Sequence, residues 1–357
     1  MNQTGRDYSD VELYRYELPR ELIAQHPLEH RIDARLLLVH RQSGEIEHFY
    51  VRDLPDLLRS GDALVLNDSK VIPARLTGTR TSTGGRWEGL FLRENDQGVW
   101  EILSKTRGRL TAGETISLRD LEGRQVPALS VVAHLDGGHL AVRPIDAVDR
   151  SSLLQRYGRV PLPPYIRDGQ MVDKDIETYQ TVYARAPGSV AAPTAGLHFT
   201  KDLIRLLQAR GVSTAAVTLH VGIGTFRPVS TRNLAEHKMH SEWGELPEKS
   251  AERLQACRNA GGRVVAVGTT SVRVLESALE KSNGEYAAWS GDTDIFIRPP
   301  HEFRSIDALM TNFHLPQSTL LALVAAFSGY DLAMRAYHHA IEQRYRFFSY
   351  GDCMLII

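Results

Sequence analysis

Apolar runs alternate with amphipathic stretches through most of the chain, and this pattern predicts strands that alternate with helices. The predicted strands are 35–40, 63–66, 214–219, 263–267, 293–297 and 308–311. The predicted helices are 53–59, 201–210, 248–259, 268–279 and a pair of helices within 318–344. Thr200 is a good N-cap for the second of these helices, and Gly211 suits the position just after its end. Such alternation favours an α/β domain built on a largely parallel sheet.

The pattern changes between residues 72 and 147, where short segments alternate apolar and polar residues and are separated by Gly, Asp and Asn. Period-two patterning at this spacing predicts a small antiparallel β-barrel or sandwich. We therefore expect a discontinuous α/β domain over 1–71 and 148–357, which carries the catalytic site, with a small β domain inserted at 72–147.

Composition and charge limit the kind of protein and its location in the cell. The chain has 357 residues, 42% of them hydrophobic, and a formal net charge of -1, which does not point to a nucleic-acid binder, although a local basic patch would be enough for one. The two cysteines, Cys257 and Cys353, form neither a zinc-type cluster nor a disulfide framework. The N-terminus lacks a secretory signal, and the longest apolar run, 319–327, is too short to span a bilayer and predicts a buried helix. We expect a soluble, cytoplasmic monomer.

Two stretches rich in small residues, 191–199 and 218–226, each place a histidine among glycines and threonines. A segment that gives up apolar area in this way gains something other than packing. His198 and His220 could supply a proton donor and acceptor near neutral pH, and the glycines would let the backbone approach a ligand closely. We interpret both stretches as walls of one active site, while a hydrogen-bonded core histidine is the alternative for either side chain.

A second group of histidines lies in the segment after 226. His237 and His240 have an i, i+3 spacing that a metal site uses, with Glu242 nearby, but two surface histidines in a loop are the simpler interpretation, and we predict no metal site. The segment around Gly222 and Gly224 resembles a dinucleotide-binding loop only superficially. It has no third glycine and no predicted helix follows it, so we reject that interpretation.

Polar residues also follow the predicted strands of the second half. Segment 268–271 joins a strand to a helix, where backbone N–H groups either hold a carboxylate or phosphate or form an ordinary capping turn. Asn312 and His314 end a strand, and in open α/β sheets such ends line the ligand crevice. Asp352 lies in a polar turn within an apolar tail, and the alternative is that this turn ties the tail down.

A compact basic turn at 105–109 lies in the predicted β domain, and Arg75 and Arg80 precede it. With an aromatic neighbour such as Trp100, these side chains could contact an RNA backbone and stack a base. A solvated basic loop is the alternative. The candidate RNA-binding residues are Arg75, Lys105, Arg107 and Arg109.

Several long motifs occur together in one order. They are 67–75, 156–165, 179–183, the two stretches at 191–199 and 218–226, 237–242, 268–273 and the run from 311 to 357. In this order the chain resembles the S-adenosylmethionine:tRNA ribosyltransferase-isomerase family of queuosine biosynthesis, from about Tyr16 to the C-terminus. So many ordered motifs make the resemblance specific, although no single motif would be.

The resemblance implies a reaction and a fold. The ribosyl group of S-adenosylmethionine would be transferred to the 7-aminomethyl-7-deazaguanine base at the tRNA wobble position and isomerised, giving epoxyqueuosine-tRNA and releasing adenine and methionine. S-adenosylmethionine would be a consumed cosubstrate, and no cofactor or metal would be needed. The implied partners are S-adenosylmethionine and a tRNA that carries the precursor base. The resemblance also implies a mixed α/β domain with an inserted β-barrel.

This chemistry requires a base that removes a proton next to the sulfonium and an acid that helps adenine leave. From residue chemistry we take His198 and His220 as the leading candidates. The other candidate catalytic residues are Glu242, His240, His314 and Asp352. The candidate substrate-binding residues are Thr194, Gly196, Gly222, Gly224, Thr269, Thr270, Ser271, Arg273 and Asn312. Among these, Arg273 is the expected partner of the methionine carboxylate.

The chain departs from the family pattern at Lys70, Pro300, His301 and Cys353. Lys70 keeps a charge but loses the guanidinium fork, which puts a two-bond role at that position in doubt. Two other functions stay open at this point. An RNA-binding module without catalysis does not explain the glycine- and histidine-rich segments. A metal-dependent hydrolase that uses His237 and His240 lacks a carboxylate-rich ligand set.

Overall fold

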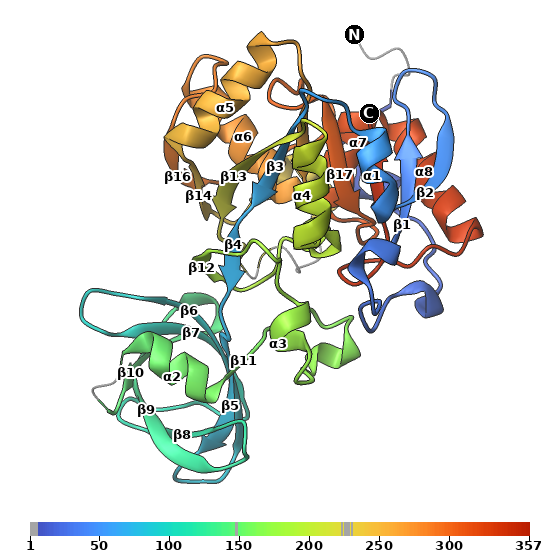
Figure 1. The fold of residues 1–357 in the computed structure, drawn as a ribbon. Helices are drawn as coiled ribbons and strands as arrows, with labels where there is room; N and C mark the ends of the chain where they lie inside the picture. Colours follow the sequence, from blue (N-terminus) through green and yellow to red (C-terminus); the bar gives the residue numbers. More distant parts are fainter. Residues whose placement is uncertain (1–5, 147–148, 223, 225–228, 230) are drawn as a thin grey trace. The chain divides into compact units, whose positions relative to one another are not determined.

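The computed structural model describes residues 6–146, 149–222, 224, 229 and 231–357, which form two compact units (Figure 1). Unit 1 spans Met1–Lys70, Pro164–Asp168 and Glu177–Ile357, and unit 2 spans Val71–Pro163 and Gly169–Ile176. Unit 2 is longer than the segment predicted at 72–147, because it also contains the helix α2 (Arg150–Tyr157) and the strand β11 (Gly158–Arg159).

Within the described residues, unit 1 holds a nine-stranded sheet in the order β16-β14-β13-β3-β15-β17-β18-β1-β2. Its strands are β1 (Arg35–Val39), β2 (Ile46–Tyr50), β3 (Ala63–Asn67), β13 (Ser213–Leu219), β14 (Glu242–Leu246), β15 (Val264–Val267), β16 (Trp289–Thr293), β17 (Ala308–Asn312) and β18 (Cys353–Ile356). The central strands β13, β3, β15 and β17 are parallel. β1 and β18 are also parallel, whereas antiparallel pairs join β1 to β2, β13 to β14, β14 to β16 and β17 to β18, so the sheet is mixed and only its central four strands form a continuous parallel run.

Helices cover both faces of this sheet (Figure 1). They are α1 (Leu54–Leu57), α4 (Lys201–Ala209), α5 (Glu248–Asn259), α6 (Thr269–Lys281), α7 (Thr319–Ser328) and α8 (Tyr330–Glu342). Because successive strand residues point to opposite faces, Val65 and Ala266 pack in the core with α5, α6, α7 and α8. Their neighbours Leu64 and Val265 pack in the core with α1 and α4. Unit 1 therefore has three layers.

Local sequence signals explain several element boundaries. Thr200 Oγ1 accepts a hydrogen bond from the Leu203 N–H at 3.1 Å, and Gly211, with φ of 85°, follows the end of α4, which confirms both predictions. The strand predicted at 293–297 is wrong, since β16 ends at Thr293. Ile297 is apolar because it packs in the core of α5–α8 without pairing in the sheet.

The apolar run at 319–327 forms the buried helix α7, as predicted. No single helix of the described chain is both long and apolar enough to cross a membrane. The consecutive helices α7 and α8 meet that criterion only when they are taken together, and they are bent by 115° at their junction.

Unit 2 contains the predicted β-barrel. Its strands are β5 (Arg75–Arg80), β6 (Arg86–Glu94), β7 (Trp100–Thr106), β8 (Thr115–Arg119), β9 (Gln125–His134) and β10 (His139–Pro144). All neighbours are antiparallel in the order β5-β6-β7-β10-β9-β8, and pairing of β8 with β5 closes the sheet. Alternate residues such as Trp87, Trp100 and Leu118 fill the interior. The strand β11 pairs with the start of β5.

The remaining elements are short. β4 (Ser69–Val71) and β12 (Ala186–Ser189) form a two-stranded sheet, and α3 (Asp175–Thr178) is a single turn of helix. The 3-10 helix η7 (Thr194–His198) contains the first histidine-bearing stretch.

Candidate functional site

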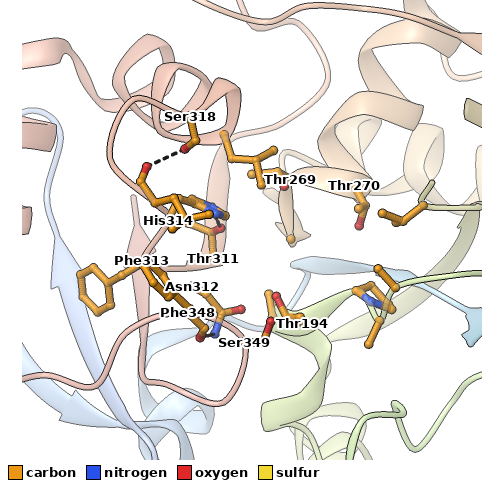
Figure 2. A pocket seen from close by; sticks show the side chains of 18 of the residues that line it. Thr194, Thr269, Thr270, Thr311, Asn312, Phe313, His314, Ser318, Phe348 and Ser349 are labelled. Carbon is orange, nitrogen blue, oxygen red and sulfur yellow. Dashed lines mark hydrogen bonds between the residues drawn. The ribbon is translucent and has the colours of Figure 1, made fainter. Parts of the chain in front are cut away.

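A cleft in unit 1 lies at the carboxyl ends of β13, β15 and β17, where open α/β sheets bind their ligands. About 680 Å³ of empty space, open solvent included, lies between its lining residues. Figure 2 shows its polar side chains gathered around one opening. The predicted residues that line it are Thr194, Thr269, Thr270, Asn312 and His314.

The start of helix α6 forms one wall of the cleft. Gly268 precedes the helix with φ of 86°, and no side chain caps the first turn. The first N–H groups of a helix have no partner inside it, and they carry the positive end of the helix dipole. Thr270 Oγ1 is also buried without a hydrogen-bond partner among the described residues. This wall is therefore suited to bind a carboxylate or a phosphate. In an ordinary capping turn, a side chain would already accept hydrogen bonds from these N–H groups.

Asn312 lies opposite, at the end of β17. Its side-chain Nδ2 contacts His198 Nε2 and the Phe348 carbonyl, each at 3.2 Å, and the Asp352 carbonyl at 3.3 Å. Its Oδ1 is buried and has no hydrogen-bond partner among the described residues. A buried acceptor left unpaired costs about 1–3 kcal/mol. A ligand that donates a hydrogen bond to Oδ1 would remove this cost.

His198 lies behind Asn312, outside this cleft, and lines a neighbouring one with Arg31 and Tyr350. Since Nδ2 of Asn312 can only donate, Nε2 of His198 accepts. Burial, with smaller effects of the Arg31 and Arg346 charges, lowers the pKa of His198 to about 4. This geometry agrees with the alternative of a hydrogen-bonded core histidine.

His314 lines the cleft itself. Its Nε2 is hydrogen-bonded to Thr311 Oγ1 at 2.8 Å, and its backbone N–H donates to the Tyr337 hydroxyl at 2.9 Å. Burial lowers the pKa of His314 to about 3, so the ring is neutral at physiological pH.

His220 borders the cleft through the next residue, Val221. Its ring stacks on Trp243, with centroids 5.3 Å apart, and Nδ1 is buried without a partner among the described residues. Burial lowers the pKa of His220, and the charge of Asp68 opposes this shift. A Cβ at Gly188 would lie 2.9 Å from the imidazole, so glycine makes room for the ring.

A second, smaller cleft shares Leu320 with the first. Its floor is the buried ion pair of Glu242 and Arg273, each about 5% exposed. Glu242 Oε1 also accepts a hydrogen bond from the Gly222 N–H at 2.7 Å. Arg273 is thus held by a carboxylate of the protein and does not line the first cleft. The other candidates on this second cleft are Gly224, His237 and His240.

The metal-site alternative has little geometric support in this segment. Within the described ranges, no group of three or more His, Cys, Asp or Glu side chains is placed to hold a metal ion. His237 instead packs edge-on against Phe296, with ring centroids 5.6 Å apart.

Two predicted glycines serve the packing of the protein. A Cβ at Gly196 would lie 2.0 Å from the Tyr183 hydroxyl oxygen, and one at Gly224 would lie 2.1 Å from His240 Cδ2. Their small size is therefore explained without a ligand. Residues 223 and 225–226 of the second glycine-rich stretch lie outside the described residues.

Ser271 and Asp352 are buried and satisfied by the backbone. Ser271 Oγ donates to the Val267 carbonyl at 2.8 Å. The Asp352 carboxylate accepts hydrogen bonds from the N–H groups of Arg35 at 2.9 Å and Arg346 at 2.8 Å. Asp352 thus ties the tail to β1, which agrees with the structural alternative given for this turn.

Several residues that line the cleft were not among the candidates predicted from the sequence. Tyr165 and Ser349 are hydrogen-bonded at 2.8 Å on the cleft wall, and Phe348 adopts a φ of 70° beside them. Thr311 and Ser318 complete the polar lining. Ser349 lies in the polar turn that the sequence analysis noted, and Tyr165 ends the motif 156–165 without having been assigned a role.

The candidate RNA-binding residues all belong to unit 2. Lys105, Arg107 and Arg109 are exposed, and the Arg80 guanidinium donates to the Arg107 carbonyl at 3.1 Å and supports the turn. The proposed stacking role of Trp100 is wrong, because its ring is fully buried inside the barrel, where its Nε1 donates to Glu94 Oε1 at 3.0 Å.

The departures from the family pattern lie in varied surroundings. Lys70 is exposed on β4, and Cys353 is fully buried in β18. The His301 ring lies 3.3 Å from the buried Glu276 carboxylate, and Pro300 follows a cis peptide bond.

Comparisons with known proteins agree along the whole chain. A sequence model of the family described as "Queuosine biosynthesis protein" matches residues 11–356. A relative from Symbiobacterium thermophilum, named S-adenosylmethionine:tRNA ribosyltransferase-isomerase, is 52% identical over 343 residues, which cover 96% of this chain and 98% of that protein. A relative of the same name from Staphylococcus saprophyticus is 48% identical over 349 residues, which cover 98% of this chain and 100% of that protein.

A solved structure agrees with the fold. The crystal structure of S-adenosylmethionine tRNA ribosyltransferase from Thermotoga maritima is 37% identical and matches with a TM-score of 0.55. The match covers 97% of this chain and 100% of that chain. The chain therefore belongs to the queuosine biosynthesis protein family.

Proposed function

We propose that this protein transfers and isomerises the ribosyl group of S-adenosylmethionine onto 7-aminomethyl-7-deazaguanine at the wobble position of tRNA, giving epoxyqueuosine-tRNA with release of adenine and methionine. The observation that carries the proposal is the match to two relatives of that name, which are 52% and 48% identical across nearly the full length of each chain. The cleft at the strand ends supplies the kind of site that such a cosubstrate needs.

S-adenosylmethionine would bind in this cleft with its methionine end at helix α6. The first-turn N–H groups and the unpartnered Thr270 hydroxyl would hold the carboxylate. The Asn312 Oδ1, also unpartnered among the described residues, would accept a hydrogen bond from the adjacent ammonium group. This assignment replaces Arg273 as the carboxylate partner, because Glu242 already neutralises Arg273.

His220, beside the cleft, would carry the proton transfers, and His314 would position the substrate. His220 would remove a C5′ proton, whose electron pair stays on a carbon stabilised by the sulfonium, and the resulting His220 imidazolium would give that proton to the departing adenine. Burial lowers the pKa of both His220 and His314, so both rings are neutral and able to accept a proton. His220 would be the base, since its Nδ1 is buried without a hydrogen-bond partner among the described residues, and His314 would position the substrate through its Thr311 pair.

The other candidates would act through these groups. His198 would hold the Asn312 amide, Asp352 would hold the tail, and Glu242 would fix Arg273 and the Gly222 N–H. A tRNA substrate is consistent with a reaction in the cytoplasm, and we propose a monomer that consumes S-adenosylmethionine and needs no cofactor.

The test mixes the protein with S-adenosylmethionine and tRNA that carries the precursor base, and follows adenine and methionine by chromatography. Joint appearance of both products only when both substrates are present would support the proposal. Binding of tRNA without adenine release would favour an RNA-binding module. Turnover that stops with a chelator and returns with zinc or manganese would favour the metal-dependent alternative.

A further inference from the structure

Four arginines line one concave region on the outside of the barrel of unit 2. We call this region the arginine pocket and define it by Arg75, Arg86, Arg119 and Arg159. About 1060 Å³ of empty space, open solvent included, lies between its lining residues, and none of the described residues that line it is an Asp or Glu.

Strand register explains why these side chains meet. In β5, Leu76 and Gly78 are buried in the barrel, so the alternate residues, including Arg75, face outward. Arg159 of β11 lies directly opposite Arg75, and Arg86 of β6 lies opposite Thr79, a lining residue of the pocket. The end of β8 brings Arg119 alongside, since the Arg159 guanidinium donates to the Arg119 carbonyl at 3.2 Å.

Local carboxylates do not neutralise this cluster. Glu88 pairs with both Arg75 and Arg86, at 3.2 Å and 2.5 Å, so one negative charge is shared between two guanidinium groups. Arg119 lies beside the neutral amide of Gln125. Burial, followed by the positive charges of Arg119 and Arg75, lowers the pKa of Arg159, and the charge of Asp120 opposes this shift.

The cluster divides into two guanidinium groups held by backbone carbonyls and two exposed ones. Arg75 donates to the Gly169 carbonyl, and Arg159 donates to the Asp120 carbonyl at 3.0 Å, so both are held by the barrel. Arg86 and Arg119 are exposed, with the Arg86 side chain 80% accessible. Two fixed guanidinium groups at the base and two exposed ones at the rim form a site for a ligand with several negative charges.

We propose that the arginine pocket binds the phosphodiester backbone of the RNA substrate. The identity of the polyanion rests on the proposed function, whereas the charge and the shape of the pocket stand on the structure. Guanidinium groups bind phosphate oxygens through paired hydrogen bonds and carry no base preference when they contact the backbone alone. The overall charge of -1 makes such a concentration of positive charge a local feature of the barrel.

The test uses the exposed pair, because Arg86 and Arg119 can be replaced with little effect on the fold. Binding of tRNA to the full chain is measured by filter binding from 50 to 200 mM salt, and the KM for tRNA by adenine release. The double variant R86A/R119A should bind tRNA about tenfold more weakly and lower the slope of log affinity against log salt by about two. R86K/R119K should recover most of the slope, and kcat should be unchanged in both variants.

The matched control is R143A. Arg143 is exposed on β10, three strands from β5 in either direction around the barrel, and it should leave both the affinity and the slope unchanged. Wild-type affinity and salt slope in R86A/R119A would overturn the proposal, as would an equal loss in R143A. Neither of these outcomes bears on the proposed function. The proposed function fails if the wild-type protein releases no adenine. Loss of the slope in K105A/R107A/R109A with none in R86A/R119A would move the RNA contact to the basic turn.

Discussion

At the scale of single residues, the cleft is marked by polar atoms that the protein leaves unpaired. The Asn312 Oδ1 and the Thr270 Oγ1 are buried without a hydrogen-bond partner among the described residues. Each such atom lowers the stability of the unliganded protein, and a ligand that pairs with it recovers that free energy as affinity. Removal of one such atom should therefore affect binding and stability in opposite directions.

Thr270→Val replaces the unpaired hydroxyl with a methyl group of nearly the same shape. We expect the KM for S-adenosylmethionine to rise about fivefold, the equivalent of one hydrogen bond of about 1 kcal/mol, while the Tm stays equal or rises. Steady-state adenine release and thermal unfolding measure the two effects. Thr270→Ser keeps the hydroxyl and is the control. A lower Tm with an unchanged KM would mean that the hydroxyl is structural.

His198 makes stability depend on pH. Its folded pKa of about 4 is lower than its ordinary value of 6.5, so the unfolded chain binds this proton first as the pH falls. The stabilisation is complete above pH 6.5 and is lost progressively toward pH 4, by about 1.4 kcal/mol per pH unit for one proton.

The measurement is urea unfolding at several pH values between 6.5 and 4.5. In His198→Gln, the unfolding free energy should decline with pH less steeply than in the wild type by about that amount per unit. His338→Gln, at an exposed position of α8, is the matched control and should retain the wild-type steepness. Equal steepness in His198→Gln and the wild type would contradict the assignment.

At the scale of elements, the caps of α4 allow a local test. Thr200→Ala removes the acceptor of the Leu203 N–H and should lower the unfolding free energy by about 1 kcal/mol. Thr200→Ser keeps the acceptor and should lose much less. Adenine release at low temperature should be unchanged in both variants, because Thr200 is not among the described residues that line the cleft. A Thr200→Ala variant as stable as the wild type would show that water replaces the cap.

The sequence predicted most elements because their signals are local. Helix α5 was predicted with its observed bounds, with Gly261 and Gly262 marking its end, and the period-two alternation of segment 72–147 predicted the barrel. Strand β18 was missed because its apolar residues pair with β1 and β17, which are distant in the chain. No local pattern separates such a strand from an apolar tail that packs on a core.

The candidate site was harder to predict because the role of each side chain depends on the side chains that pack against it. His198 and His314 both follow glycine- or strand-end signals, yet only His314 lines the cleft, since Asn312 separates His198 from it. Arg273 of α6 can bind a carboxylate, but the buried Glu242 of β14 already forms an ion pair with its guanidinium. The sequence gives the residue types, and the packing decides which of them stay available.

At the scale of the whole molecule, each unit should respond to its own substrate. S-adenosylmethionine should slow amide hydrogen exchange at the start of α6 and after β17, and leave the barrel strands unchanged. The tRNA should slow exchange in β5, β8 and β11 around the arginine pocket. Mass spectrometry of exchanged peptides measures both footprints. Protection of the barrel by S-adenosylmethionine alone would contradict this division.

The position of β18 also determines the order in which the molecule can be made. Leu36 of β1 pairs with Cys353, so the interior of the large sheet stays open until residues 353–356 leave the ribosome. The barrel strands β5–β10 lie wholly within residues 75–144 and need no later strand to close. During synthesis the barrel can therefore fold while the apolar residues of β1 and β3 stay exposed, because β18 and β13, which pair with them, have not yet been made. Nascent chains of this protein should depend on chaperones through the N-terminal strands, and the barrel should be the first part to resist proteolysis.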